Sequence, residues 1–196
     1  LINNAGLYTS DRELSEDGYE MMFAVNHLSH FLLTDLVLDK IKAAQGRIVN
    51  VSSIAHKQTR DFDFDDVNLD KDFSGWKGYS RSKFCNIAFT KELARRLEGT
   101  GVTTNCLHPG GVSTEIAQKD ANWYTKLGWM IGRLFFISPE EGAQTSIYLA
   151  SSDEVKDTSG EYFYNCKKVY SNRPSQDPEL AKKIWDFSEK LVKEAS

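Results

Sequence analysis

Tyr79 and Lys83 lie four residues apart in the run Tyr79-Ser80-Arg81-Ser82-Lys83, inside a stretch whose pattern predicts a helix. Residues four apart share one face of a helix, so the two side chains can reach each other. A phenol has a pKa of about 10 in water, and a neighbouring ammonium group lowers that pKa by stabilising the phenolate. The pair therefore has the chemistry of a proton donor and acceptor at neutral pH. Alone, this spacing is weak evidence, because many unrelated helices contain it as a surface pair.

Three further polar features stand among apolar residues. Ser53 follows a run that predicts a buried strand, and its hydroxyl could hydrogen-bond a substrate oxygen and stabilise developing charge. Asn26 lies within a predicted helix among apolar neighbours, a costly place for an amide without a specific partner. The sequence Asn3-Asn4-Ala5-Gly6 forms a tight polar turn after a short apolar stretch. Each feature also has a plain structural explanation: a cap, a satisfied core amide and an ordinary turn.

The elements that must position these residues alternate between short apolar runs and longer amphipathic stretches. Such alternation predicts an α/β fold whose parallel strands are joined by right-handed helical crossovers. Strands are expected at residues 1–2, 47–53, 102–107 and 162–164, and helices at 15–44, 76–98, 139–150 and from 178 onward. Ligands bind beyond the carboxyl ends of the strands in such a sheet. The turn at 3–6, Ser53 and the segment 109–111 all follow predicted strands, so the sequence predicts one site there.

Local signals support several of these boundaries. Gly46 is expected to cap the first long helix at its C-terminus. The sequence Ser138-Pro139-Glu140-Glu141 has the capping-box spacing with proline at the first helical position. The Asp-rich stretch 56–74 is expected to be a solvated loop, because its spacing fits no EF-hand. The second long helix has a predicted inner stripe at four-residue spacing: Cys85, Phe89, Leu93 and Leu97.

The composition fits a single domain spanning residues 1–196, with 40% hydrophobic and 27% charged residues. A formal net charge of −4 and the absence of Lys/Arg-rich runs argue against nucleic acid as a partner. No apolar run is expected to reach the roughly 18–20 residues of a membrane-spanning helix. The longest candidate, 127–137, is short and is interrupted by Gly132-Arg133.

The three cysteines are unevenly spaced, which favours reduced thiols, with Cys85 and Cys106 as small core residues. No Cys/His cluster has metal-ligand spacing, so no metal is expected. His27 and His30 lie three residues apart on a predicted helix. Without carboxylate or thiol neighbours, they are expected to pack or to lie on the surface.

Jointly, the motifs resemble the short-chain dehydrogenase/reductase family. The matching features, in the family's order and approximate spacing, are Asn3–Gly6, Asn26, Val49–Ser53, Tyr79-x-x-x-Lys83 and Pro109-Gly110-x-Val112-x-Thr114. Within the family, His108–Gly110, Lys91–Leu97 and Glu141–Ser146 resemble the retinol dehydrogenase 11-to-14 subgroup. The resemblance implies a Rossmann-type doubly wound parallel sheet and an NAD(P)-dependent oxidoreductase that interconverts an alcohol and a carbonyl.

The same resemblance implies a role for each catalytic candidate. Tyr79 resembles the family's acid/base, and Ser53 resembles the residue that orients the substrate oxygen. Lys83 resembles the residue that lowers the tyrosine pKa and holds the nicotinamide ribose. Asn26 resembles the helix residue whose backbone supports a water that leads protons away from Lys83.

The family's cofactor contacts carry over in the same way. The turn at 3–6 resembles the segment beside the adenosine part of the cofactor, and the loop after 108 resembles the one that contacts the nicotinamide and its phosphate. The residues implied to bind the cofactor, NADP with NAD as the alternative, are Asn3, Ala5, Gly6, Tyr79, Lys83, Pro109, Gly110, Val112 and Thr114.

The sequence departs from the family at its N-terminal side. The family's Gly-rich turn, Thr-Gly-x-x-x-Gly-x-Gly, would lie roughly 70–80 residues before the Asn-Asn-Ala-Gly turn and cradle the pyrophosphate. We therefore expect an N-terminally truncated chain that holds only the C-terminal portion of the fold and lacks its first strands. We expect these 196 residues alone to be inactive, without tight cofactor binding or stable folding.

The substrate and the setting are expectations of the family. Residues 123–136 are rich in large apolar side chains, which suits a lid over an apolar substrate such as a retinoid or a lipid aldehyde, or equally ordinary packing or a membrane-facing patch. The alternatives are a reductase of small or xenobiotic carbonyls and a non-catalytic dinucleotide-binding relative. The resemblance leaves a homo-oligomer open and suggests association with the endoplasmic reticulum or mitochondrial membrane, with a cytoplasmic protein as the other choice.

Overall fold

A computed structural model describes residues 1–110 and 138–195 of the chain. These residues form a sheet whose strands lie in the order β1 (Ile2–Asn3), β2 (Arg47–Val51), β3 (Thr103–Leu107), β4 (Tyr162–Tyr164) and β5 (Lys167–Val169). Strands β1 to β4 are parallel, and β5 runs antiparallel to β4. Sequential strands lie side by side, so the carboxyl ends of β1, β2 and β3 share one edge.

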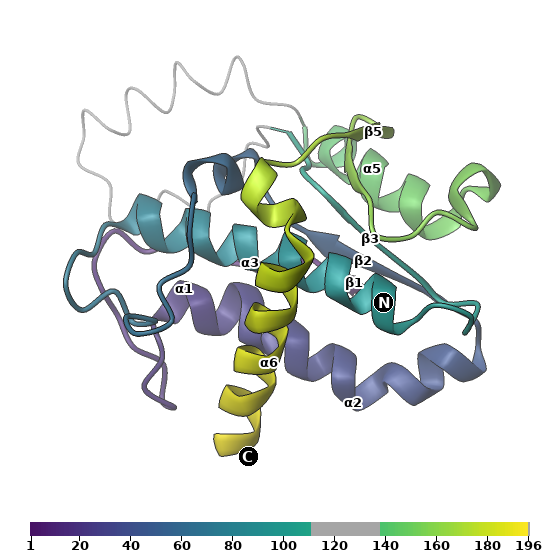
Figure 1. The fold of residues 1–196 in the computed structure, drawn as a ribbon. Helices are drawn as coiled ribbons and strands as arrows, with labels where there is room; N and C mark the ends of the chain where they lie inside the picture. Colours follow the sequence, from purple (N-terminus) through teal and green to yellow (C-terminus); the bar gives the residue numbers. More distant parts are fainter. Residues whose placement is uncertain (111–137, 196) are drawn as a thin grey trace.

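Helices cover both faces of this sheet (Figure 1). Ile48 of β2 faces a core built with α2 (Ser29–Ala43), α3 (Gly75–Arg96) and α6 (Pro178–Glu194). The next residue, Val49, faces the opposite core, which it shares with Leu149 of α5 (Pro139–Ser151). Coverage of both faces explains why β2 and β3 are buried along almost their whole length, without an alternation of buried and exposed residues. The prediction of an α/β fold with a mainly parallel sheet is confirmed.

Several predicted boundaries are confirmed. The helix expected at 76–98 is α3, and its predicted stripe is buried, as are both Cys85 and Cys106. The capping box at Ser138 is present, with reciprocal hydrogen bonds to Glu141. Burial raises the pKa of the Cys85 thiol and of the Cys106 thiol to about 12, so both are inert core residues.

The first long helix starts later than predicted. Residues 15–19 form a turn, and the helix begins with α1 (Met21–Phe23), where the Glu20 carboxylate accepts hydrogen bonds from the backbone N–H groups of Met22 and Phe23 at 2.9 Å each. A π-helical turn, η1 (Ala24–Leu28), joins α1 to α2. Gly46 does not cap this helix in the left-handed conformation; Gln45, with φ of 46°, takes that position instead.

Two other expectations are corrected. Strand β5 was not predicted; it pairs with β4 through a two-residue turn in which Asn165 and Cys166 both have positive φ. The stretch 56–74 is not wholly solvated, because Phe62 and Leu69 are buried. Arg81 of α3 holds this stretch in place by donating to the backbone carbonyl of Asp66 at 3.0 Å and to that of Val67.

The segment Met21–Ala43 is long and apolar enough to cross a membrane by length and composition, contrary to the expectation that no such run exists. In the structure it is a core helix whose inner side also buries polar groups, including Asn26 and Thr34. Both Asn26 and Thr34 have hydrogen-bond partners within the protein. The helix α6 lies across α3 and α2 (Figure 1) and covers their outward side.

Candidate active site

Ser53 and Tyr79 meet at the carboxyl edge of the sheet. Ser53 directly follows the end of β2 and caps a 3-10 turn, η2 (Ile54–Gln58), with its hydroxyl accepting from Ala55 N at 3.2 Å. Tyr79 lies in the second turn of α3, and its phenol hydrogen-bonds the Ser53 side chain. Ser53 and Tyr79, whose roles the family resemblance implied, are therefore neighbours at this edge of the sheet.

Burial and this hydrogen bond act on Tyr79 in opposite directions. Desolvation raises the pKa of Tyr79, and the hydrogen bond from Ser53 lowers it, with burial the stronger of the two. The net direction is therefore upward, opposite to the lowering that was expected from Lys83. The Lys83 ammonium lies 5.7 Å from the centroid of the Tyr79 ring, over its π face.

Lys83 is buried, and this has a clear electrostatic effect. Desolvation lowers its pKa from 10.5 to about 8. Its Nζ donates to the carbonyl oxygen of Val51, the last residue of β2, at a distance of 3.2 Å. An ammonium group has three N–H donors, so Lys83 keeps donors that can reach a ligand beside Tyr79.

Asn26 lies inside the π-helical turn η1, and its side-chain amide makes three hydrogen bonds. Its Oδ1 accepts from the backbone N–H of Leu7 at 2.8 Å, and its Nδ2 donates to Leu7 O and to Ser82 Oγ, each at 3.0 Å. Its backbone carbonyl accepts from Asn86 Nδ2 at 2.9 Å. Asn26 thus ties the segment after the Asn3–Gly6 turn to α3, and one acceptor position of its carbonyl is already occupied.

Gly6 lies where these groups converge. A Cβ at this position would come within 3.2 Å of Asn26 Oδ1 and 3.3 Å of Lys83 Nζ, closer than most side-chain contacts. The lack of a side chain therefore keeps the backbone of the turn near the catalytic candidates. A glycine in such a place allows close approach of the chain or of a ligand.

Asn3 has a different position from the one expected for a residue that touches a cofactor. Its side chain is buried and donates to Thr34 Oγ1 at 2.9 Å and to Asn50 Oδ1 at 2.8 Å. The amide of Asn50 in turn donates to Thr90 Oγ1 at 2.9 Å. The Asn3 amide hydrogens therefore help to hold β1, β2 and the helices α2 and α3 together, whereas Asn4 and Ala5 are exposed and Gly6 is half-buried.

At the carboxyl end of β3, the structure describes the residues up to Gly110. Pro109 and Gly110 follow β3, and Gly110 adopts φ of 96°, a conformation that favours glycine. Gly110 N–H donates to His108 Nδ1 at 3.3 Å. Val112, Thr114 and the predicted lid at 123–136 lie outside the described residues.

Two aromatic side chains that flank Tyr79 were not predicted. The Tyr8 ring lies edge-on to Tyr79 with centroids 6.0 Å apart, and the Trp76 ring lies 6.2 Å away. Gly75 permits the approach of Tyr8, because a Cβ there would lie 2.7 Å from the Tyr8 hydroxyl oxygen. Trp76 precedes Tyr79 by three residues, a helical spacing that could have revealed it.

The same helical spacing applies to two further residues that were missed. Ser82 and Asn86, three and seven residues after Tyr79, are the positions on α3 that contact Asn26. Residues at i, i+3, i+4 and i+7 share a helix face. The face that carries Tyr79 and Lys83 therefore also contains the side chains that hold Asn26.

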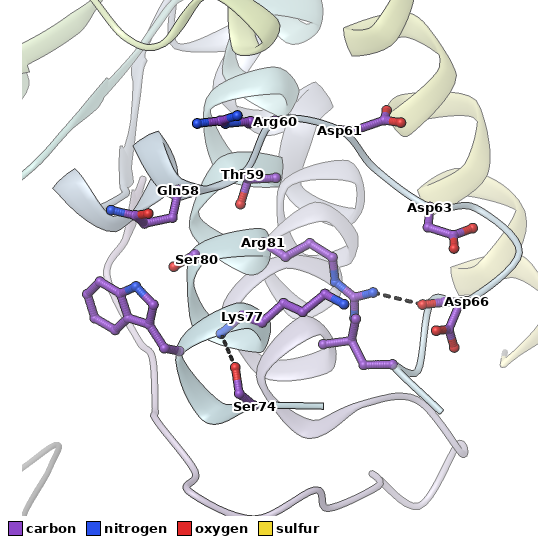
Figure 2. A pocket seen from close by; sticks show the side chains of 12 residues that line it. Gln58, Thr59, Arg60, Asp61, Asp63, Asp66, Ser74, Lys77, Ser80 and Arg81 are labelled. Atoms are coloured by element: carbon purple, nitrogen blue, oxygen red, sulfur yellow. Dashed lines mark hydrogen bonds between the residues drawn. The ribbon is translucent and has the colours of Figure 1, made fainter. Parts of the chain in front are cut away.

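A cavity of about 270 Å³ lies beside this face, between the segment 58–69 and the start of α3 (Figure 2). Trp76, next to Tyr79, forms part of its wall, and the buried Ser80 hydroxyl, which has no partner among the described residues, forms another part. The charged side chains of this wall are Arg60, Asp61, Asp63, Asp66, Lys77 and Arg81. So many charged side chains suit a long apolar substrate poorly, so this cavity does not support an apolar substrate.

His27 and His30 are both buried, consistent with packing. Among the described residues, no group of three or more His, Cys, Asp or Glu side chains could hold a metal ion. His27 Nδ1 contacts Asn86 Oδ1 at 3.2 Å and its Nε2 contacts Ser188 Oγ at 2.8 Å. Burial, followed by the charge of Lys83, lowers the pKa of His30 to about 4.

The comparisons with known proteins agree with this geometry. The family model described as short chain dehydrogenase matches residues 1–125. The chain therefore belongs to the short-chain dehydrogenase family, whose Rossmann-type sheet the described residues share.

Individual relatives narrow the comparison. The chain is 49% identical to human retinol dehydrogenase 14 over 98% of its length, and 44% identical to human retinol dehydrogenase 13, also over 98%. It spans 58% and 60% of these relatives. These identities agree with the motifs at 91–97 and 141–146, which resemble this subgroup and retinol dehydrogenase 14 in particular. A crystal structure of an uncharacterized protein from Mycobacterium paratuberculosis matches 98% of the chain and 66% of its own length, with a TM-score of 0.73 and 31% identity.

Proposed function

We propose that the protein is an NAD(P)-dependent oxidoreductase that interconverts an alcohol and a carbonyl, with Tyr79 as the acid/base. The observation that carries the proposal is the contact of the Ser53 hydroxyl with the Tyr79 phenol, beside the Lys83 ammonium 5.7 Å from the phenol ring. A carbonyl oxygen placed between Ser53 and Tyr79 would meet two hydroxyl donors at once. This arrangement suits a substrate oxygen that gains negative charge during reduction.

The residues around the site fit a nicotinamide dinucleotide. Gly6 leaves open the space that a side chain would fill between Asn26 and Lys83. The remaining donors of the buried Lys83 ammonium can serve ribose hydroxyls. When bound, such a cofactor supplies or removes the hydride. Two solved structures that contain such a cofactor, a 4-hydroxyisoleucine dehydrogenase with NADH and a chicken carbonyl reductase with NADPH, share the fold at 22% and 18% identity.

In this mechanism the chain's own residues move the proton. Tyr79 donates its phenolic proton to the carbonyl oxygen in reduction and removes a proton from the alcohol in oxidation. Ser53 orients the substrate oxygen and hydrogen-bonds the phenol. The Lys83 charge stabilises the phenolate electrostatically. Asn26 fixes the segment at Leu7 against α3, so that the site keeps its shape.

Substitution of Tyr79 tests the proposal. In the full-length protein, Tyr79→Phe removes the acid/base and should lower kcat by at least 100-fold, since general acid–base catalysis contributes about 10²–10⁴-fold. Cofactor affinity should change little. Tyr170→Phe is the matched control, because it makes the same change at a tyrosine that is 85% exposed. Turnover by Tyr79→Phe at the wild-type rate would refute the proposed role.

We further propose an apolar substrate such as a retinoid or lipid aldehyde, and NADP rather than NAD as cofactor. The support is the identity to human retinol dehydrogenases 14 and 13 together with the apolar content of residues 123–136. The alternative is reduction of small or xenobiotic carbonyls, and the charged cavity beside Trp76 favours that reading. Comparing kcat/KM for all-trans-retinal and for a small quinone, each with NADPH and NADH, separates these substrates and cofactors.

A non-catalytic dinucleotide-binding relative is the remaining alternative. The presence of both Tyr79 and Lys83 favours an enzyme. By family resemblance, the proposal also includes association with a second copy of the chain and with a membrane. Cofactor binding without turnover of any alcohol or carbonyl would favour the non-catalytic relative.

A further inference from the structure

His56 is a fully buried histidine three residues after Ser53, within the turn η2. Its ring Nδ1 lies 2.6 Å from the carbonyl oxygen of Ser53, and its Nε2 lies 3.1 Å from the backbone nitrogen of Asn172. A carbonyl oxygen only accepts and an amide N–H only donates. The two partners therefore define the tautomer: Nδ1 carries the proton, and Nε2 is the acceptor.

These contacts complete a set of anchors on both sides of Ser53. On the preceding side, Ser52 N–H donates to Leu107 O at 2.8 Å and Ser52 Oγ donates to Lys83 O at 2.7 Å. On the following side, the Ser53 carbonyl accepts from both the ring Nδ1 and the backbone N–H of His56. With both flanking peptide groups fixed, the Cα–Cβ bond of Ser53 is fixed, and the hydrogen bond that its Oγ accepts from Ala55 N–H orients the hydroxyl oxygen.

The Nε2 side of the His56 ring is also fixed by hydrogen bonds and by packing. Asn172 donates its backbone N–H to the ring and its side-chain Nδ2 to the carbonyl oxygens of His56 and Thr59, at 3.2 Å and 2.7 Å. The ring of Tyr162 in β4 packs edge-on to His56 with centroids 5.0 Å apart. The ring thus links the end of β2 to the segment that leads into α6.

We propose that His56 is a positioning residue for Ser53: its neutral, Nδ1-protonated ring fixes the Ser53 carbonyl and thereby aims the Ser53 hydroxyl at Tyr79 and the substrate oxygen. This inference rests on the proposed function, in which Ser53 orients the substrate. His56 itself acts through Ser53 and needs no contact with substrate or cofactor. Asn172, through the Nε2 contact, holds the ring in the orientation that this role requires.

Two isosteric substitutions separate the two sides of the ring. The side-chain amide nitrogen of asparagine can take the place of Nδ1, so His56→Asn can keep the donor to Ser53 while losing the acceptor for Asn172. Conversely, the amide oxygen of glutamine can take the place of Nε2, so His56→Gln can keep the Asn172 contact while losing the donor to Ser53. Each variant loses one buried hydrogen bond, so their melting temperatures should fall to a similar extent.

Their kinetics should differ. We expect His56→Gln to lower kcat about 10- to 100-fold, less than the loss of a complete oxyanion donor, with the KM for the cofactor unchanged. His56→Asn should keep kcat within about 3-fold of the wild type, because the donor to Ser53 remains. Ser188→Ala, which removes a hydrogen bond from another buried histidine, His27, is the control for stability alone. Equal kcat values for the two His56 variants would overturn the inference.

A double-mutant comparison separates this inference from the proposed function. If His56 acts through Ser53, His56→Gln should cause no further loss of kcat in a Ser53→Ala background. A wild-type rate for Ser53→Ala would contradict the role of Ser53 itself. Loss of rate in Ser53→Ala, but not in His56→Gln, would overturn only the inference about His56.

A measurement that needs no activity completes the test. Nitrogen NMR of the wild-type imidazole should show His56 protonated at Nδ1 and unprotonated at Nε2 at neutral pH. This result is expected whether or not the variants fold. A ring protonated at Nε2 would leave the Ser53 carbonyl without its donor and would overturn the proposal.

Discussion

The phenol of Tyr79 hydrogen-bonds the hydroxyl of Ser53, although Ser53 follows strand β2 and Tyr79 belongs to helix α3. A long segment joins the two, and it is not a free loop. Arg81 binds this segment to α3 through the carbonyls of Asp66 and Val67. The contact that defines the candidate site is therefore supported from the side of β2 by His56 and from the side of α3 by Arg81.

The first prediction concerns Ser53→Ala. This substitution removes the hydrogen bond that lowers the pKa of Tyr79 and leaves the burial that raises it. In the oxidation direction Tyr79 must be deprotonated, so activity should rise with pH through the Tyr79 pKa. The rising limb should therefore move to higher pH in Ser53→Ala, and kcat should fall at least 10-fold. The pH profile of kcat checks this; a limb at the wild-type position would speak against the contact.

The second prediction concerns the buried charge of Lys83. Its pKa is lowered from 10.5 in the unfolded chain to about 8 in the folded protein. The stability linked to this group is therefore present above pH 10.5 and is lost as the pH falls through about 8. Lys83→Met removes the buried charge, so this variant should be more stable than the wild type at pH 7, by on the order of 1 to 3 kcal/mol.

The advantage of Lys83→Met should disappear between pH 8 and 10.5, as the wild-type lysine loses its proton. Its turnover should fall at least 100-fold even though its stability rises, because the proposed catalysis needs the ammonium group. Denaturant unfolding of both proteins from pH 7 to pH 10.5 measures the first effect. A stability difference that is constant over this range would show that Lys83 does not titrate there.

The sequence predicted the site residues best where chemistry depends on spacing along one element. Tyr79 and Lys83 share a helix face, and Ser53 ends an apolar strand, so both features are visible without coordinates. The spacing did not predict the electrostatic outcome at Tyr79, because burial depends on what packs around α3. Desolvation by residues distant in sequence reverses the expected direction of that pKa.

The features that escaped prediction depend on uncommon residues or on long-range contacts. Glu20 caps a helix, although serine, threonine, aspartate and asparagine are the usual caps. Asn165 and Cys166 form a hairpin turn that usually contains glycine at its second position. His56 and Asn172 lie 116 residues apart, so no local pattern connects them. Tertiary contacts alone reveal such pairs.

The third prediction concerns acid unfolding and His27. Burial, with a smaller contribution from the charge of His30, lowers the pKa of His27 from 6.5 to about 3, against the opposing hydrogen bond to Asn86. The folded state therefore holds a neutral ring that the unfolded chain protonates, and the linked stability is present above pH 6.5 and is lost as the pH falls to about 3. A full shift of this size corresponds to on the order of 4 kcal/mol.

His27→Gln keeps a side chain that can bond Asn86 or Ser188 but removes the titration. The variant should be less stable than the wild type at pH 7, where it loses part of the buried contact. The difference should narrow as the pH falls from 6.5 toward 3, because only the wild type pays for a neutral buried imidazole. Unfolding free energies at several pH values in this window check the trend. A parallel decline of the two proteins would mean that His27 is not the group responsible.

The fourth prediction tests the close approach at Gly6. In Gly6→Ala, the added Cβ would lie 3.2 Å from Asn26 Oδ1 and 3.3 Å from Lys83 Nζ, so the turn and the ammonium must move apart. We expect the Kd for the nicotinamide cofactor to rise about 10-fold or more, since small displacements of a preorganised site are costly. Calorimetric titration of the full-length protein measures this affinity.

Gly46→Ala is the matched control for Gly6→Ala. It adds the same methyl group at a position where the nearest atom, Ile41 Cγ2, lies at an ordinary 3.4 Å and where φ is not positive. Its cofactor Kd should equal that of the wild type. If both variants bind the cofactor as the wild type does, the space beside Gly6 is not part of the cofactor site. A weakened Gly6→Ala beside an unchanged Gly46→Ala instead places the cofactor against Lys83 and Asn26, where the proposed chemistry requires it.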